Sequence, residues 1–224
     1  MMIELQGVSK TFSSGRGHVA ALSDISFTMA KGQRGVLFGR SGSGKTTLLN
    51  CIGTLETPDS GAIVIDGCDI CRLSHRQRCH FRSKSVGFLF QAANLLPWLS
   101  VAENLMFPLE QNGIKGLEQR RRIDALLAAV GLRGYDKAMP AELSGGEAQR
   151  IAFARAIAHR PAILLADEPT ANLDSANSRV MIDEIHALCR EQRTTVLIAT
   201  HDHELVSTSD VVICLKDGRL EEKR

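Results

Sequence analysis

A glycine-rich stretch of eight residues holds the clearest chemical pattern in this sequence. It reads Gly39-Arg40-Ser41-Gly42-Ser43-Gly44-Lys45-Thr46, and it fits the pattern G-x-x-x-x-G-K-[ST]. A short apolar run precedes it, and residues 47–52 after it are typical of the first turns of a helix. Glycines allow backbone N–H groups to converge on one point, and a helix N-terminus adds partial positive charge there. We therefore expect a phosphate cradle, in which Lys45 reaches the β- and γ-phosphates and the Thr46 hydroxyl ligates Mg²⁺.

Two other apolar runs end in side chains that suit work beside a triphosphate. Residues 163–166 lead into Asp167 and Glu168, and residues 195–199 lead into Thr200 and His201. Ligands of open α/β sheets bind beyond the carboxyl ends of the strands. One carboxylate suits the Mg²⁺ shell, the other suits a base that orients attacking water, and His201 suits a hydrogen bond to developing charge. The structural alternatives are a solvated acidic turn before Pro169 and a histidine that merely starts a helix.

A second candidate anion site has no lysine of its own. The segment Leu143-Ser144-Gly145-Gly146-Glu147 opens a helix. Ser-x-x-Glu is a capping box, which would by itself explain the Ser and the Glu. The two glycines, however, leave a bare helix N-terminus that can bind an anion. One full phosphate loop and one half-site in the same chain indicate two copies that share two nucleotides head to tail.

The elements that must position these residues follow an α/β order. Residues 2–12 and 19–28 predict an antiparallel pair of strands, and strands alternate with helices from residue 33 onward. Between residues 91 and 142 no clear strand is present, and the i, i+3, i+4, i+7 spacing of Ile123, Leu126, Leu127 and Val130 predicts a helix. Residues 101–112 predict a less regular helix, interrupted by Pro108. We therefore expect a mostly parallel sheet with a helical insert, which begins where Gln91 ends the short strand of residues 86–90.

Composition limits the class of protein. The chain has 224 residues, is 44% apolar and 23% charged, and carries a net charge of +2, which gives no support for nucleic-acid binding. It contains no run of about 20 apolar residues and no signal-peptide pattern at its start, so we expect a soluble chain that stays in the cytosol. Six scattered cysteines fit reduced thiols.

One cluster of cysteines and histidines leaves two alternatives open: Cys68, Cys71, His75, Cys79 and His80. Such residues can bind zinc. Alternatively, Cys68 and Cys71 flank a turn, and Cys79 lies on the next helix. No second Cys-x-x-Cys pair completes a zinc pattern.

Taken together, the motifs resemble those of the nucleotide-binding domain of ATP-binding-cassette (ABC) transporters over essentially the whole chain. The resemblance rests on residues 39–46, Gln91, residues 143–147, Asp167-Glu168, Ala171-Asn172-Leu173-Asp174 and His201, in that family's order. It implies a P-loop NTPase fold of class α/β with a mostly parallel core sheet, an N-terminal antiparallel β subdomain and an inserted α-helical subdomain. Residues 1–90 and 160–224 would form the RecA-like catalytic core with the β subdomain, and residues 91–159 would form the helical subdomain with the signature motif.

The resemblance also implies roles and two cofactors, ATP and Mg²⁺. Glu168 would be the general base, His201 would contact the γ-phosphate, and Gln91 would couple the metal to the helical lobe. Thr46, Gln91 and Asp167 would hold Mg²⁺. The nucleotide would contact Phe12, Gly39, Ser41, Gly42, Ser43, Gly44, Lys45, Thr46, Thr47, Ser144, Gly145, Gly146 and Asp174. Phe12 stands where the family usually has a Tyr that stacks on adenine, and a core position in a strand is its alternative role. Glu147 replaces the commoner Gln of the signature, which we expect to leave activity intact.

Within the family, residues 91–97, 101–104 and 199–202 resemble the lipoprotein-releasing and macrolide-efflux branch, with the bacterial cell-division ATPase in the same neighbourhood. The resemblance implies a homodimer on the cytoplasmic face of the inner membrane, with a separate permease docking near residues 91–105. Trp98 would either be buried or receive a permease helix. Export or membrane extraction is the expected function, and mechanical signalling without solute transport is the alternative. A soluble ATPase acting on DNA or ribosomes fits poorly, because no long coiled coil or second cassette is present. A domain that binds nucleotide without hydrolysing it also fits poorly, because no catalytic position looks degenerate.

Overall fold

The structure, a computed structural model, describes residues 1–14, 17–171, 173 and 175–221. The chain divides into two compact units. The first contains Met1–Arg82, Leu165–Asp167 and Thr195–Arg224, and the second contains Ser83–Leu164 and Glu168–Thr194. The helical lobe expected at residues 91–159 lies within the second unit, which also includes one strand before it and one helix after it.

The first unit contains an antiparallel sheet with the strand order β2-β1-β4-β5. Its strands are β1 (Ile3–Ser14), β2 (Gly17–Met29), β4 (Ser60–Ile65) and β5 (Cys68–Asp69). Ile3, Leu5 and Val8 of β1 are buried, while Gln6 between them is exposed. This alternation buries one face of the sheet. The expected pairing of the first two strands is confirmed, with Ile3 opposite Met29 and Phe12 opposite Val19.

A second sheet in the same unit is mostly parallel. Strand β3 (Arg34–Phe38) lies between β8 (Thr195–Thr200) and β9 (Val211–Lys216) and is parallel to both. Strand β10 (Arg219–Leu220) pairs antiparallel with β9, and β7 (Ile163–Asp167) is the neighbour of β8. All six residues of β8 are buried, as expected for a central strand whose sequence is apolar without alternation.

Short helices complete the first unit. Helix α1 (Lys45–Ile52) contacts both β2 and β8, and it buries Leu48, Leu49 and Ile52 completely. Helix α7 (His203–Ser207) contacts β3. After β5, the chain forms the 3-10 turn η1 (Ile70–Arg72) and helix α2 (His75–Ser85), whose last three residues belong to the second unit.

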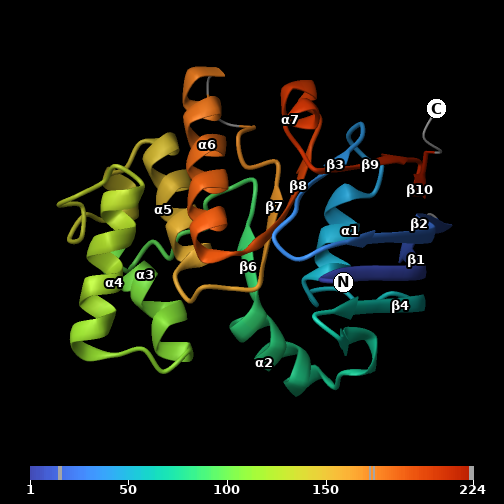
Figure 1. The fold of residues 1–224 in the computed structure, drawn as a ribbon, viewed down its shortest axis with the longest axis horizontal. Coiled ribbons are helices and arrows are strands. Elements are labelled where there is room, and N and C mark those ends of the chain that lie inside the picture. The colour runs from blue at the N-terminus through green and yellow to red at the C-terminus, as the bar shows by residue number, and fades with distance from the viewer. Residues whose placement is uncertain (15–16, 172, 174, 222–224) are drawn as a thin grey trace. The chain divides into compact units, whose positions relative to one another are not determined.

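The second unit is built mainly of helices that lie side by side (Figure 1). They are α3 (Val101–Gln111), α4 (Gly116–Ala129), α5 (Gly145–Ile157) and α6 (Ser175–Gln192), with the 3-10 turn η2 (Pro140–Glu142) before α5. Helix α5 contacts the other three helices and strand β6 (Val86–Leu89), so it forms the centre of this unit. Strand β6 is hydrogen-bonded to β7, whose first two residues belong to the same unit.

The apolar face predicted for the insert is confirmed, since Ile123, Leu126, Leu127 and Val130 are all buried. The predicted interruption at Pro108 is wrong, because α3 continues through the proline. Buried residues on both sides of Pro108 hold the helix in place, namely Val101, Leu105 and Leu109. In the described part of the chain, no helix has the length and apolar character needed to cross a bilayer.

Candidate nucleotide-binding site

The glycine-rich loop follows β3 and leads directly into α1, as the sequence predicts. Two of its glycines are required by close packing. A Cβ atom at Gly39 would clash with the carbonyl oxygen of Leu215, and one at Gly44 would lie 2.5 Å from the carbonyl oxygen of Ala21. Gly44 also has φ +103, a left-handed conformation that glycine adopts at little cost. The loop therefore has the shape that its sequence pattern predicts because larger residues would not fit.

The turn between β9 and β10 supports this loop from its side. The Gly218 N–H donates to the Ser43 carbonyl oxygen at 3.0 Å, and the Ser23 N–H donates to the Gly218 carbonyl oxygen at 2.7 Å. Ser43 is buried, and its Oγ has no hydrogen-bond partner within the described residues. A buried, unsatisfied hydroxyl costs free energy, which a bound anion with oxygen acceptors would recover.

Lys45 lies inside the curve of the loop. Its Nζ donates to the carbonyl oxygens of Gly39 at 2.8 Å and Arg40 at 3.1 Å, and only 5% of the residue is exposed. Lys45 is also the first residue of α1, so the ammonium and the positive end of the helix lie at the same place. Thr46 is exposed at this helix start, and Thr47 is half-buried. The arrangement concentrates positive charge where the neighbouring Ser41 and Gly42 are open to solvent.

The first unit brings His201 to the edge of the sheet from which this loop departs. Phe38 and Thr200 are register partners in parallel strands, so the loop and His201 leave the sheet side by side. The Asp202 N–H donates to Thr200 Oγ1 at 3.0 Å, and the rings of His203 and Phe38 lie 4.7 Å apart. These contacts fix the segment around His201. Asp167 is the last residue of β7, the strand next to β8.

Phe12 lies near the end of β1 with 39% of its surface exposed, so the alternative of a buried core position is wrong. Its register partner Val19 is 61% exposed, and the two form a small apolar surface. The Lys10 Nζ lies over the Phe12 ring, 5.2 Å from its centroid.

The second unit contains the other half of the predicted site. Ser144 is the N-cap of α5, and the expected capping box is present. Glu147 N–H donates to Ser144 Oγ at 3.3 Å, while one Glu147 carboxylate oxygen accepts from Ser144 Oγ at 2.7 Å and from Ser144 N–H at 2.8 Å. These bonds from Ser144, together with one from Tyr135, lower the pKa of Glu147. Gly145 is exposed with open space around it, so the helix tip is accessible.

Tyr135 supports this capping box, and no pattern in the sequence indicates this role. Its hydroxyl donates to the other carboxylate oxygen of Glu147 at 2.9 Å, which raises the pKa of Tyr135. The two residues come from different segments, the connection after α4 and the first turn of α5. Glu147 therefore joins the helix tip to the connection that precedes it.

Two further residues missed at the sequence level bind the segment around Gln91 to α5. The buried Gln149 donates from Nε2 to the Phe90 carbonyl oxygen at 2.9 Å. The Arg155 guanidinium donates to the carbonyl oxygens of Asn94 at 2.8 Å and Ala93 at 3.0 Å, and burial lowers the pKa of Arg155. Gln91 is exposed within this segment. The only signal in the sequence is that both residues interrupt the otherwise apolar inner side of α5.

Buried Asn104 organises the loop that follows Gln91. Its side chain exchanges hydrogen bonds with Leu96 N–H at 2.9 Å and Leu96 carbonyl oxygen at 3.2 Å, and it donates to the carbonyl oxygens of Leu99 and Ser100, both at 3.0 Å. Trp98 in this loop is 71% exposed, so a buried packing role is wrong for the chain alone.

Glu168 has an unusual backbone conformation, with φ +44. A left-handed conformation is uncommon for a residue of this type, and such strain is concentrated at functional sites. The Ala171 N–H donates to the Glu168 carbonyl oxygen at 3.1 Å, which closes a turn after β7. Asn172 and Asp174, which the sequence analysis singled out, lie outside the described residues.

The zinc alternative finds no support, because the described residues contain no group of three His, Cys, Asp or Glu side chains that could hold a metal ion. Cys68 lies in β5 and Cys71 in η1, which follows β5 directly, and Cys79 lies on the next helix, α2, as the other alternative predicts. Burial raises the pKa of Cys71 and raises that of Cys51 to about 12, which disfavours the thiolate form of both side chains.

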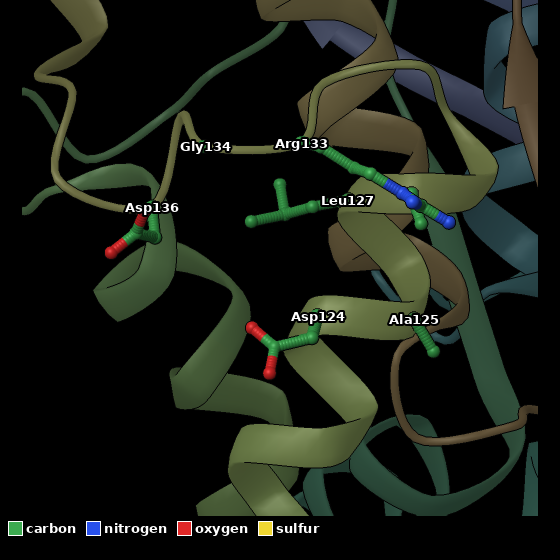
Figure 2. Close-up of a pocket in the computed structure, with 7 residues that line it drawn as sticks. Asp124, Ala125, Leu127, Arg133, Gly134 and Asp136 are labelled. Carbon is green, nitrogen blue, oxygen red and sulfur yellow. The ribbon is translucent and has the colours of Figure 1, made fainter.

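A hollow of about 440 Å³ lies in the second unit between the C-terminal half of α4 and residues 133–136 (Figure 2). The side chains of Asp124 and Asp136 border it, with Arg133 on its rim. None of the lining residues belongs to the predicted site, and none lies in the glycine-rich loop or at the start of α5. It is therefore not a candidate for triphosphate binding.

Comparison with known proteins agrees with the motifs. The sequence family described as ABC transporter matches residues 22–171. The chain is 41% identical to the lipoprotein-releasing system ATP-binding protein LolD 2 of Caulobacter vibrioides over 100% of this chain and 98% of that protein. It is 40% identical to the macrolide export ATP-binding/permease protein MacB of Syntrophobacter fumaroxidans, over 98% of this chain and 31% of that longer protein. A solved structure of a dimeric ATP-binding cassette in a post-hydrolysis state, bound to ADP and Pi, matches with a TM-score of 0.92 and 35% identity, covering 100% and 98% of the two chains.

Proposed function

Because the chain belongs to the ABC transporter family, we propose that it is the ATP-hydrolysing subunit that drives a separate membrane permease in export or membrane extraction. The chain is an ABC ATPase, and its fold matches cassettes of that family. The names of the relatives, lipoprotein release and macrolide export, favour outward transport or extraction over mechanical signalling. Such a subunit works at the cytoplasmic face of the inner membrane and reaches the bilayer through its partner.

The phosphate-binding residues fit a nucleoside triphosphate. The Lys45 ammonium and the backbone N–H groups at the start of α1 lie within one loop, where they would bind the β- and γ-phosphates. No all-protein metal cage is present among the described residues, and Mg²⁺ in such sites takes most of its ligands from phosphates and water. Thr46, Asp167 and Gln91 would complete its shell, and the ion would neutralise charge on the phosphate oxygens.

The remaining residues have roles that follow from their chemistry. Glu168 would accept a proton from the attacking water, and His201 would donate a hydrogen bond to the charge that develops on the γ-phosphate. Gln91 would couple changes at this site to the helices of the second unit, because Gln149 and Arg155 bind the adjoining residues to α5.

The observation that carries the proposal is the exposed tip of α5. The half-buried to exposed residues Ser144, Gly145 and Gly146 present a helix N-terminus, and the motif at residues 143–147 contains no lysine. A second copy, related by a twofold axis, would place this tip on the γ-phosphate held by the first copy. ATP would close the pair, hydrolysis would open it, and the permease docked near residues 91–105 would follow.

The test is ATP turnover and assembly of the purified chain. We expect Mg²⁺-dependent ATP hydrolysis whose specific activity rises with protein concentration, because the active species is a dimer. Gel filtration of the Glu168→Gln variant should show a dimer with Mg²⁺-ATP and a monomer without nucleotide. Specific activity that does not depend on protein concentration, with Glu168→Gln monomeric in ATP, would contradict the shared site. Copurification with membrane proteins then identifies the permease.

A further inference from the structure

The ring of Phe12 is flanked by a lysine. Lys10 and Phe12 are two residues apart on β1, so their side chains leave the same face of the strand. The Lys10 Nζ lies 5.2 Å from the ring centroid, within the range of a cation–π interaction. Because the ammonium occupies one face of the ring, a planar ligand can stack only on the other face.

The turn before β4 holds this ammonium in place. Lys10 Nζ donates to the Thr57 carbonyl oxygen at 2.8 Å and to Asp59 Oδ1 at 3.5 Å, and it lies 3.7 Å from Glu56 Oε2. Only 14% of the Lys10 side chain is exposed, which is low for a lysine on a strand that reaches the surface. Three partners from one turn therefore fix a side chain that would otherwise be mobile.

The same turn also fixes the backbone of β1 immediately before Phe12. Asp59 Oδ2 accepts from the Thr11 N–H at 2.7 Å, and the Asp59 N–H donates to the Ser9 carbonyl oxygen at 2.8 Å. The Thr11 bond, followed by the charge of Lys10, lowers the pKa of Asp59. One carboxylate thus holds both the strand that carries Phe12 and the cation that covers its ring.

From this geometry we infer that Lys10, held by Asp59, is a positioning residue that prepares the open face of Phe12 for the base of the nucleotide. The ammonium draws π-electron density toward itself and leaves the opposite face better suited to an electron-rich purine. The neighbouring Val19 extends the apolar surface on which the base lies. This inference rests on the proposed ATP site, and it assigns Lys10 to selection of the base rather than to binding of the phosphates.

The experiment compares ATP with inorganic tripolyphosphate, which has no base, by calorimetric titration without Mg²⁺. We expect Lys10→Met to weaken ATP binding by about threefold to tenfold, the range of cation–π and stacking contributions, while tripolyphosphate affinity stays the same. Lys10→Arg keeps a cation over the ring and should restore ATP affinity. In a Phe12→Leu background, Lys10→Met should change neither affinity, because the aromatic ring through which it acts is gone.

Two further variants serve as a control and as a substitute in this experiment. Lys31→Met removes the same charge from an exposed turn and should leave both affinities unchanged. Lys10→Gln keeps a donor for the Thr57 carbonyl oxygen and serves if Lys10→Met does not fold. Equal losses of ATP and tripolyphosphate affinity, or ATP affinity unchanged in both Lys10→Met and Lys10→Gln, would overturn the inference while leaving ATP binding by the parent intact. A parent chain that binds no ATP would instead overturn the proposed function.

Discussion

Ser144→Ala separates the structural role of the α5 tip from its proposed role in a shared ATP site. The substitution removes the hydroxyl that exchanges hydrogen bonds with Glu147 at 2.7 and 3.3 Å. A structural role alone predicts lower stability and nothing else. The shared site predicts a further loss, because the same hydroxyl would bind the γ-phosphate held by the second copy.

The chain supplies a matched control in Ser100, the N-cap of α3. Its capping box has nearly the same geometry, with Ser100 Oγ 2.9 Å from Glu103 Oε2 and 3.3 Å from Glu103 N. Both serines belong to the same compact unit, and both helices begin with a glutamate at the third position. Ser100→Ala therefore reproduces the structural cost without touching the proposed phosphate site.

The magnitudes follow from these contacts. Loss of an N-cap serine costs about 1 kcal/mol in unfolding free energy, so each variant should lower the Tm by about 2–4 °C in a chain of this size. A hydrogen bond to a charged group contributes about 1.5–3 kcal/mol. A symmetric dimer contains two such bonds, so Ser144→Ala should weaken ATP-dependent dimerisation by about 3–6 kcal/mol, or roughly 140-fold to 20,000-fold.

Analytical ultracentrifugation in Mg²⁺-ATP measures the dimer dissociation constant, with Glu168→Gln as the common background so that ATP is not consumed. Thermal unfolding of the same samples measures stability. We expect the two serine variants to have similar Tm values and dimer constants that differ by at least about 100-fold. If Ser144→Ala and Ser100→Ala dimerise equally well, the α5 tip is only a helix cap, and the shared-site reasoning fails.

Three further predictions concern the same site. Lys45→Ala should reduce ATP affinity by at least about 100-fold, because it removes the ammonium from the phosphate loop; calorimetry showing unchanged affinity would exclude Lys45 from the site. Glu168→Gln should lower the ATPase rate constant by at least about 100-fold and leave ATP affinity within about twofold, which a coupled phosphate-release assay and titration can check. Finally, the folded state lowers the pKa of Glu147, so the contribution of its carboxylate to stability is complete above the ordinary pKa and is lost as pH falls through the lower folded value. In acid below about pH 4.5, the Tm of the parent should therefore fall more steeply than that of Glu147→Gln. Parallel Tm curves for the two proteins would contradict this.

Local features of this protein were predictable because short-range chemistry decides them. The phosphate loop follows from glycines that allow close approach and positive φ, and these stand within eight consecutive residues, as at Gly44. The buried strand β8 follows from a continuous apolar run, and the cap of α5 follows from the spacing of Ser144 and Glu147. The order of these motifs was enough to indicate the family, which the comparisons confirm.

Pro108 and Trp98 show where local reasoning was wrong or left the outcome open. The proline predicted a break in α3, but buried side chains on both sides keep the helix continuous. Trp98 left two alternatives open, because an aromatic residue in a loop can be buried or exposed, and its 71% exposure depends on how Asn104 folds that loop. Packing from other parts of the chain decides both outcomes, and no pattern within a few residues encodes it.

The sequence alone determined which groups are available to bind phosphates and in which order they occur, because those groups lie in contiguous motifs. Only the tertiary structure decided which distant residues support them. Tyr135 reaches Glu147 across a turn, Arg155 holds carbonyl groups about 60 residues away, and Asp59 holds Lys10 over the Phe12 ring. These contacts depend on the path of the chain between the partners, since hydrogen bonds and cation–π interactions act only over a few ångströms.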